Sequence, residues 1–273
     1  MTTFADIPDF KKDSERRKVN YLAFPEGTPT NVRILDAGAK RYFKHFLPKQ
    51  RVSVVCPGDG CPICANNRKL IEMNPDVQAN AIKGYIGRQT RFMVNVLNRT
   101  LVKFDSAGNP HFKGPNGEFP SLVPGTTESL EAISPVTLNR VEVLERGSTL
   151  FSQLNALNDS ILDPKTGERA GLTNFDVTFI VNGSGKSMTI AVIPNLQGMD
   201  VINLADYELY DFDSIVLNLT SDEIQKLLEG ISLKDIFALR RSKNAVSMDA
   251  TPPTVDDDIA NEVGDALASL FNS

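Results

Sequence analysis

The chain has 273 residues, of which 41% are hydrophobic and 23% charged, and its formal net charge is -5 at pH 7. These values are typical of a soluble globular protein with one large domain and tails. No run of about eighteen apolar residues occurs, which excludes a membrane-spanning helix. The N-terminus also lacks the basic and apolar regions of a secretory signal, so we expect a cytoplasmic protein.

The charge is unevenly distributed along the chain. Lys and Arg outnumber Asp and Glu by 18 to 10 in residues 1–110, whereas the last 25 residues hold six acidic residues and no basic one. The basic N-terminal half indicates a site for a polyanion, and the acidic tail indicates a segment that imitates this polyanion. The alternative is a solvated surface of mixed charge, ended by a disordered solubilising tail.

In chain order, residues 1–20 predict a flexible basic arm, with five basic residues between Lys11 and Lys18. From Thr30 onward, short apolar runs separated by turn signals are typical of β-structure. The hydrophobic pattern predicts short helices between some of these runs. Strands are expected at 31–35, 41–47, 51–55, 85–97, 135–144, 174–181 and 187–193, and helices at 65–73, 147–157, 221–228 and 234–241, with a Gly- and Pro-rich loop at 105–128.

The three cysteines lie within nine positions, which is a poor disulfide framework and a good metal cluster. Zinc prefers four tetrahedral ligands drawn from thiolate and imidazole. The pair Cys61-Pro-Ile-Cys64 has the spacing of a zinc knuckle, Cys56 precedes it across a Gly-rich turn, and His45 lies eleven residues before Cys56. We predict one zinc ion bound by His45, Cys56, Cys61 and Cys64, because His111 lies far downstream.

Four protein ligands fill the coordination shell, so this zinc is predicted to be structural and not catalytic. Iron also accepts sulfur-rich ligands, although the imidazole favours zinc. The alternative to any metal is three unpaired buried cysteines.

A zinc deaminase would carry Glu at position 47, where this chain has Leu47, and Pro before the cysteine pair, where it has Gly60. Gly185-Lys186-Ser187 lies in an expected hairpin turn and not in a phosphate-binding loop. We therefore expect that the protein is not an enzyme.

Basic and aromatic residues alternate around the histidine ligand and again after the cysteines. Proteins that bind single-stranded nucleic acids combine cations along the phosphates with aromatic rings that stack on bases. Because successive side chains of a strand point to opposite faces, about half of these aromatic residues are expected in the core. The candidate contacts are Lys40, Arg41, Tyr42, Lys44, Lys49, Arg51, Lys83, Tyr85, Arg88, Arg91 and Phe92.

The C-terminal segment combines acidic residues with an apolar row at helical spacing. Its acidic residues, from Asp249 to Asp265, are expected to occupy the cationic site when no nucleic acid is bound. Its apolar row is expected to dock into a partner protein. The partner-binding residues are Asp256, Asp257, Asp258, Leu267, Leu270 and Phe271.

The order His45, Cys56, Cys61-Pro-Ile-Cys64 resembles the zinc site of the T-even phage type of single-stranded DNA-binding (helix-destabilising) protein. The basic arm, the length, the acidic tail and the segment from Gly171 to Pro194 are similar as well. The resemblance implies a zinc-binding subdomain beside an oligonucleotide-binding (OB) barrel. It also implies roles in phage DNA replication, recombination and repair in a bacterial host cell, with replication and recombination proteins bound through the tail. Self-association on DNA through the N-terminal arm is a further implication, although the arm has no clear match to the basic Ser/Thr-Leu motif that the family uses for it.

The pattern of short strands and excursions likewise predicts a mainly β (α+β) fold, an OB-like five-stranded barrel with an inserted zinc subdomain at about 41–75. We expect an arm at 1–20, a core at 21–242, and a linker with the acidic tail at 243–273. The predicted function is to coat and protect single-stranded DNA without strong sequence preference. The alternative is a zinc-knuckle regulatory or interaction protein whose basic patch binds RNA or a protein.

Overall fold

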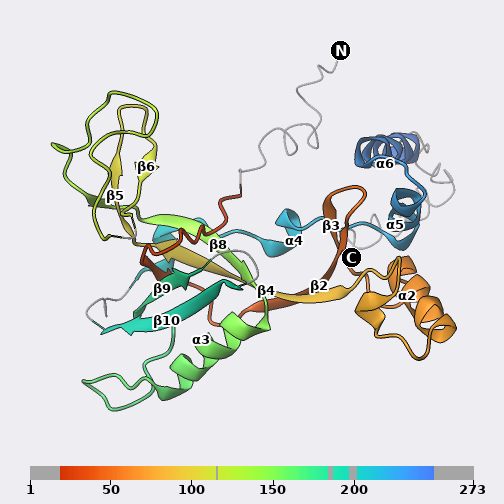
Figure 1. Cartoon of the computed structure of the whole chain (residues 1–273), viewed down its shortest axis with the longest axis horizontal. Coiled ribbons are helices and arrows are strands. Elements are labelled where there is room, and N and C mark those ends of the chain that lie inside the picture. Colours follow the sequence, from red (N-terminus) through yellow and green to blue (C-terminus); the bar gives the residue numbers. More distant parts are fainter. Residues whose placement is uncertain (1–18, 115, 184–186, 197–201, 249–273) are drawn as a thin grey trace, which may run out of the picture.

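The computed structural model describes residues 19–114, 116–183, 187–196 and 202–248. Nearly all of the expected N-terminal arm, and the tail from residue 249 onward, lie outside these residues. Among the helices that the structure describes, none has the length and apolar character to cross a membrane. The fold is α+β, built mostly from antiparallel sheet with short helices around it (Figure 1).

The main sheet is centred on the long strand β4, whose eleven residues pair with three other strands. One edge of β4 pairs with β1 and then with β2, and the other edge pairs with β8. The sheet continues outward through β9 to β10 at one end and through β2 to β3 at the other. Its strands are β1 (Thr30–Ile34), β2 (Lys40–Leu47), β3 (Val52–Val55), β4 (Arg88–Asn98), β8 (Arg140–Arg146), β9 (Asp176–Asn182) and β10 (Thr189–Asn195).

The expected closed barrel is wrong for the described residues, because this sheet is open. The segment from Asn20 to Gly27 approaches the free edge of β8, where Leu22 N donates to Val143 O over 2.9 Å. It forms isolated bridges only, at Tyr21 and at Glu26, and no continuous strand. The bridge at Tyr21 is to Val143 of β8 and the bridge at Glu26 is to Val181 of β9, so the segment contacts two different strands and extends neither ladder.

Most of the loop expected at 105–128 is confirmed among the described residues, since only the two-residue strand at Pro110–His111 interrupts it, and the loop belongs to a small lobe. The lobe is a three-stranded sheet with β5 in the middle, inserted between β4 and β8, and it projects from one end of the main sheet (Figure 1). Turn hydrogen bonds hold its longer loops, such as Val123 N to Glu128 O at 2.9 Å. The strands are β5 (Leu101–Phe104), β6 (Pro110–His111) and β7 (Val136–Thr137).

Two apolar layers cover the two faces of the sheet around β4. On one face, α3 (Ser148–Ser160) packs Phe151 and Leu154 against Val94 of β4 and Phe175. The opposite face carries Met93 and Leu97, which the segment 202–216 covers, including η5 (Leu204–Asp206) and α4 (Phe212–Ile215). Alternation of apolar residues along β4 therefore supplies both layers.

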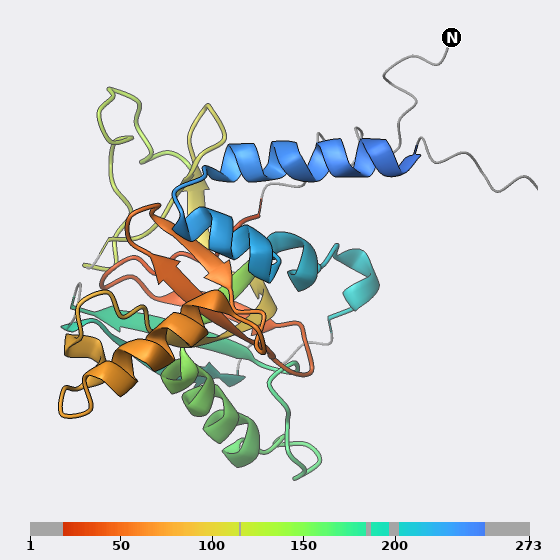
Figure 2. The ribbon, with the colours of Figure 1, turned by 90° about the vertical axis from the view of Figure 1, so that its right-hand side faces the viewer.

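A third apolar cluster, which includes Cys56 and Cys61, lies where helices cover the far end of β2 and β3; Figure 2 shows these helices beside the two strands. The cluster joins α2 (Pro62–Met73), α5 (Ser221–Leu228) and α6 (Leu233–Met248) to the two strands. A short 3-10 turn, η2 (Ala79–Ala81), follows α2. The capping box of Thr220 and Glu223 begins α5. The linker expected from residue 243 is wrong for residues 243–248, because α6 continues to Met248, and the rest of the expected linker lies outside the described residues.

Candidate metal centre and cationic groove

The four predicted ligands come from three neighbouring elements. His45 lies on β2, Cys56 directly follows β3, and Cys61 and Cys64 lie at the start of α2. Gly58 and Gly60 both have φ of +80°, a conformation that favours glycine and lets the turn fold back onto β2. Cys56 N donates to Phe43 O over 2.8 Å, which continues the pairing of the two strands up to the ligand.

The ligand atoms form a compact cluster in which all four lie within 4.8 Å of one another. Cys56 Sγ is 3.7 Å from Cys64 Sγ, and His45 Nε2 is 3.7 Å from Cys61 Sγ and 3.4 Å from Cys64 Sγ. Tetrahedral zinc, with bonds of about 2.3 Å to sulfur and about 2.0–2.1 Å to nitrogen, places neighbouring ligand atoms about 3.5–3.8 Å apart. The cluster can hold one metal ion, and its donors and spacings fit zinc.

The imidazole is oriented by a hydrogen-bond chain that sequence analysis missed. His45 Nδ1 donates to Ile86 O over 3.3 Å, which leaves Nε2 facing the thiols. Asn67, buried on α2, holds Ile86 in turn: its Nδ2 donates to Ile86 O over 2.6 Å, and its Oδ1 accepts from Ile86 N over 3.0 Å. Such outer partners fix the tautomer and the ring orientation of a metal-binding histidine. Asn67 follows Cys64 by three residues, so helical spacing places it on the same face.

Burial acts on the protonation of the ligands. It is the largest cause that raises the pKa of the Cys64 thiol to about 12, and the neighbouring Cys56 and Cys61 contribute to this rise. Burial also lowers the pKa of His45, which favours the neutral imidazole that binds metal. A divalent cation among the thiols would favour their thiolate forms, since cysteine ligands lose their protons when they bind metal.

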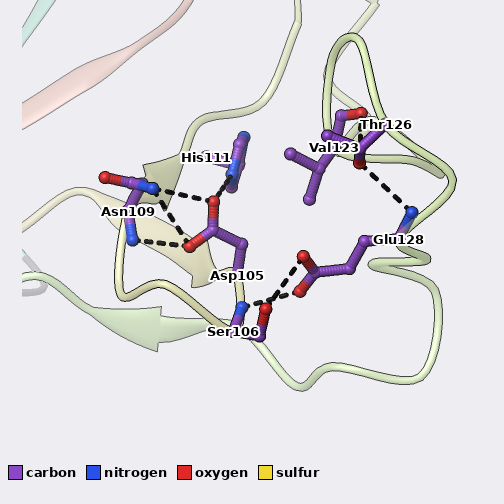
Figure 3. A network of polar contacts seen from close by, with 7 residues as sticks. All are labelled: Asp105, Ser106, Asn109, His111, Val123, Thr126 and Glu128. Carbon is purple, nitrogen blue, oxygen red and sulfur yellow. Dashed lines mark hydrogen bonds and ion pairs between the residues drawn. The ribbon is translucent and has the colours of Figure 1, made fainter.

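The other histidine is held elsewhere, as expected. His111 lies in the lobe on β6, where its Nε2 is 3.1 Å from Asp105 Oδ2 (Figure 3). Asp105 also accepts from Asn109 N over 2.7 Å, and this bond is the largest cause that lowers the pKa of Asp105 to about 2. Together with the bonds of Ser106 to Glu128, this network shapes the turns of the lobe (Figure 3).

We expect Asn67→Ala to weaken zinc binding by about 10- to 100-fold, because His45 loses its support. Competition with a chromogenic chelator measures the change in affinity. Asn66→Ala is the matched control, since Asn66 is an exposed residue of the same helix. Equal zinc affinities of the Asn67→Ala variant and the wild type would remove Asn67 from the metal centre.

The register of the sheet brings three of the predicted nucleic-acid contacts together. Tyr42 of β2 lies directly opposite Arg91 of β4, and Lys44 follows on the same face. Phe46 continues this face of β2 and is 44% exposed. Basic and aromatic side chains thus alternate along one face of the strand, whereas His45 points to the other face.

Two connected hollows of about 300 and 200 Å³ lie along this face. Tyr21, Lys44 and Glu145 line both, so they form one depression, which we call the cationic groove. Its charged and aromatic lining residues are Tyr21, Tyr42, Lys44, Arg91, Glu145 and Arg146, and most of the other lining residues are apolar. Tyr21 and Arg146 were missed by sequence analysis. Tyr21 is an aromatic residue beside the basic arm, and Arg146 lies two residues beyond the strand expected at 135–144, but only the fold places them here.

The remaining predicted contacts lie outside the groove. Arg41 and Arg88 share the opposite face, where their guanidinium carbons lie 4.9 and 4.4 Å from the centroid of the Phe43 ring. Phe92 stacks on Phe151 in the α3 layer, with ring centroids 5.2 Å apart. Lys40 forms an ion pair with Asp213 of α4. The other four are at the β2–β3 turn or in the segment before β4: Lys49, Arg51, Lys83 and Tyr85.

Comparison with known proteins adds no family to this description. No family model matches the chain, and a search of curated proteins found no match either. The fold and the two sites therefore define only a class: an α+β protein with a buried Cys3His centre that fits zinc, on the strand that also carries a cationic groove.

Proposed function

We propose that this protein binds single-stranded DNA in the cationic groove, without catalysis, and that one structural zinc ion stabilises it. The observation that carries the proposal is the pairing of Tyr42 with Arg91, beside Lys44, along one face of β2 and β4. Cations along a groove with accessible rings are the features that bind a strand with little dependence on sequence.

The role proposed for zinc follows from the ligand set. Four protein donors complete a tetrahedral shell and leave no position for a substrate, so the ion would be structural. His45 and Lys44 are adjacent on β2 and point to opposite faces. Zinc at His45 would therefore hold the strand that presents Tyr42 and Lys44 to the groove.

The ligand order and the uneven charge also support the resemblance to the T-even phage type of single-stranded DNA-binding protein. On this proposal the protein coats and protects DNA strands during replication, recombination and repair. The acidic tail would recruit partner proteins, and the N-terminal arm would mediate self-association. The open sheet would serve in place of the closed OB barrel.

A second candidate is a zinc-knuckle module that binds a partner protein or RNA. The observation in its favour is the apolar end of α2, where Ile71 is 42% and Met73 77% exposed. In that case the cationic groove would not discriminate between single- and double-stranded DNA.

The direct test is fluorescence anisotropy with a labelled dT oligonucleotide, an equal-length duplex and a single-stranded RNA at one salt concentration. We expect the single DNA strand to bind at least about tenfold more tightly than the duplex, because only unpaired bases can stack on the groove tyrosines. Tighter binding of the duplex, or no binding of any nucleic acid, would reject the proposal. Preference for RNA alone would favour the second candidate.

Tyr21 provides a test of stacking. It is 47% exposed and lines both hollows of the groove. Since stacking on one base is worth about 1–3 kcal/mol, Tyr21→Ala should weaken binding of the dT oligonucleotide by about 5- to 150-fold. Tyr21→Phe keeps the ring and should bind like the wild type. If Tyr21→Ala also bound like the wild type, no base would stack on this residue.

A further inference from the structure

An acidic side chain lies in the middle of the cationic groove. Lys44 Nζ donates to Glu145 Oε1 over 2.5 Å, and both side chains are only 18% exposed. The neighbouring Tyr42 side chain also lowers the pKa of Glu145. Glu145 lies opposite Met93 in the sheet, on the same face as Arg91 and two positions along from it. The carboxylate therefore occupies the position between the groove cations.

Two arginines beside this carboxylate each have a hydrogen-bond donor that is not used. The Nε atoms of Arg91 and Arg146 are both buried without a hydrogen-bond partner. Arg146 is held by its backbone neighbour, Glu145 O at 3.0 Å, and by the Phe24 ring, 4.3 Å from its guanidinium carbon. Arg91 NH2 donates to Gln89 over 2.8 Å. Within the described part of the chain, neither arginine forms an ion pair with an acidic side chain.

The two arginines also lie close to each other. Burial is the largest cause that lowers the pKa of Arg146, and the positive charge of Arg91 lowers it further. Like charges in a half-buried position are stabilised by an anion with several acceptor oxygens, and a phosphate group offers more acceptors than a carboxylate. The hollow of about 300 Å³ beside them is lined by Lys44, Arg91 and Arg146 and can admit such a group.

The carboxylate of Glu145 is already engaged. Burial alone would raise its pKa, but the hydrogen bond from Lys44, the neighbouring Tyr42 side chain and the charges of Lys44 and Arg91 lower it overall, so the group is a stable anion. A strand that binds in the groove must compete with this anion for Lys44. It must also tolerate the negative charge that stays beside its phosphate.

We propose that Lys44, Arg91 and Arg146 form one phosphate-binding position for the DNA strand, and that Glu145 is an internal competing anion that sets how tightly this position binds. The inference rests on the proposed function. On binding, Lys44 transfers from Glu145 to the phosphate, and Glu145 stays beside Tyr42. Glu145 thus lowers the affinity for DNA from within the folded part of the chain, separately from the acidic tail.

The test is Glu145→Gln in the full chain, with binding of the dT oligonucleotide measured by anisotropy. Gln keeps the shape and an acceptor for Lys44 but removes the charge. We expect binding to tighten by about 5- to 20-fold, because an ion pair no longer has to break and a like charge is gone. The slope of log affinity against log salt should steepen by up to about 0.7, the share of one phosphate contact.

Glu131→Gln is the matched control, because it makes the same change of net charge at an exposed residue of the lobe. It should leave affinity within about twofold of the wild type. Glu145→Ala is the second variant, should Glu145→Gln fold poorly, and it should tighten binding as well. Unchanged or weaker binding by folded Glu145 variants, or equal tightening by Glu131→Gln, would overturn the inference while the wild type still binds DNA. A wild type that binds no strand would instead reject the proposed function.

Discussion

The His45→Asn variant is expected to purify without stoichiometric zinc, whereas His111→Asn keeps one equivalent. The two substitutions are chemically identical, but only His45 lies among the cysteine thiols. Inductively coupled plasma mass spectrometry of the purified proteins measures the metal content. A full equivalent of zinc in His45→Asn would contradict the assignment of the fourth ligand.

Loss of the metal should also lower the stability of the chain. The ligands Cys56 and Cys61 belong to the apolar cluster that joins Ile63 of α2 to α5 and α6. Structural zinc sites contribute a binding free energy of about 10–16 kcal/mol near neutral pH, part of which appears as folding free energy. We expect a loss of at least about 5 kcal/mol, which lowers the Tm by about 10–20 °C in a domain of this size. Circular dichroism with and without a zinc chelator measures it, and an unchanged Tm would show that the cluster folds without metal.

The double variant Lys44→Gln/Arg91→Gln is expected to bind the dT oligonucleotide about 100-fold more weakly than the wild type, or worse. Each charged hydrogen bond to phosphate is worth about 1.5–3 kcal/mol, and both residues line the groove. The salt slope should become shallower by up to about 0.7, because both residues contact the same phosphate. Anisotropy titrations at several salt concentrations give both quantities.

A matched pair of cations lies away from the groove, in the loop after α3. Lys165 is exposed, and Arg169 forms only an exposed ion pair with Asp159 at 3.3 Å. Lys165→Gln/Arg169→Gln removes the same charge and should change affinity by less than about threefold, because exposed ion pairs and distant charges contribute little. If both double variants lost affinity equally, the binding would reflect net charge and not the groove.

The metal ligands could be predicted from the sequence because their chemistry is local. Cys56, Cys61 and Cys64 are separated by a turn, and a choice between two histidines completed the set. The structure places His45 with the thiols and His111 with Asp105. Asn67 was missed because its role depends on the position of Ile86, nineteen residues later, which only the folded chain brings near.

The sequence indicates which kinds of residue line the groove, but it does not indicate how they are arranged in space. Alternation correctly divides β2 into two faces, yet the register that sets Tyr42 against Arg91 depends on the pairing with β4. Tyr21, Glu145 and Arg146 come from two other segments, whose approach to β2 is a matter of tertiary structure. The closed barrel was expected from the pattern of short strands and from the family resemblance, whereas in the structure the segment from Asn20 to Gly27 forms only isolated bridges to β8 and β9.

The hairpin of β9 and β10 and the capped helix α5 were predicted well, because turn and capping signals act over a few residues. The lobe was not predicted, since its strands are too short to show a hydrophobic period. Arg41 and Phe92 both belong to the basic and aromatic pattern of the sequence, but they face away from the groove. The pattern alone therefore does not show which of its residues line the groove.

The central claim, that the cationic groove binds a single strand of DNA, is tested most directly by a salt titration of wild-type binding to a labelled dT oligonucleotide. The one phosphate position formed by Lys44, Arg91 and Arg146 predicts a slope of log affinity against log salt of about -0.7 or steeper. The wild type should meet this value, and Lys44→Gln/Arg91→Gln should not. A slope near zero, or the same slope and affinity in the double variant, would contradict the account.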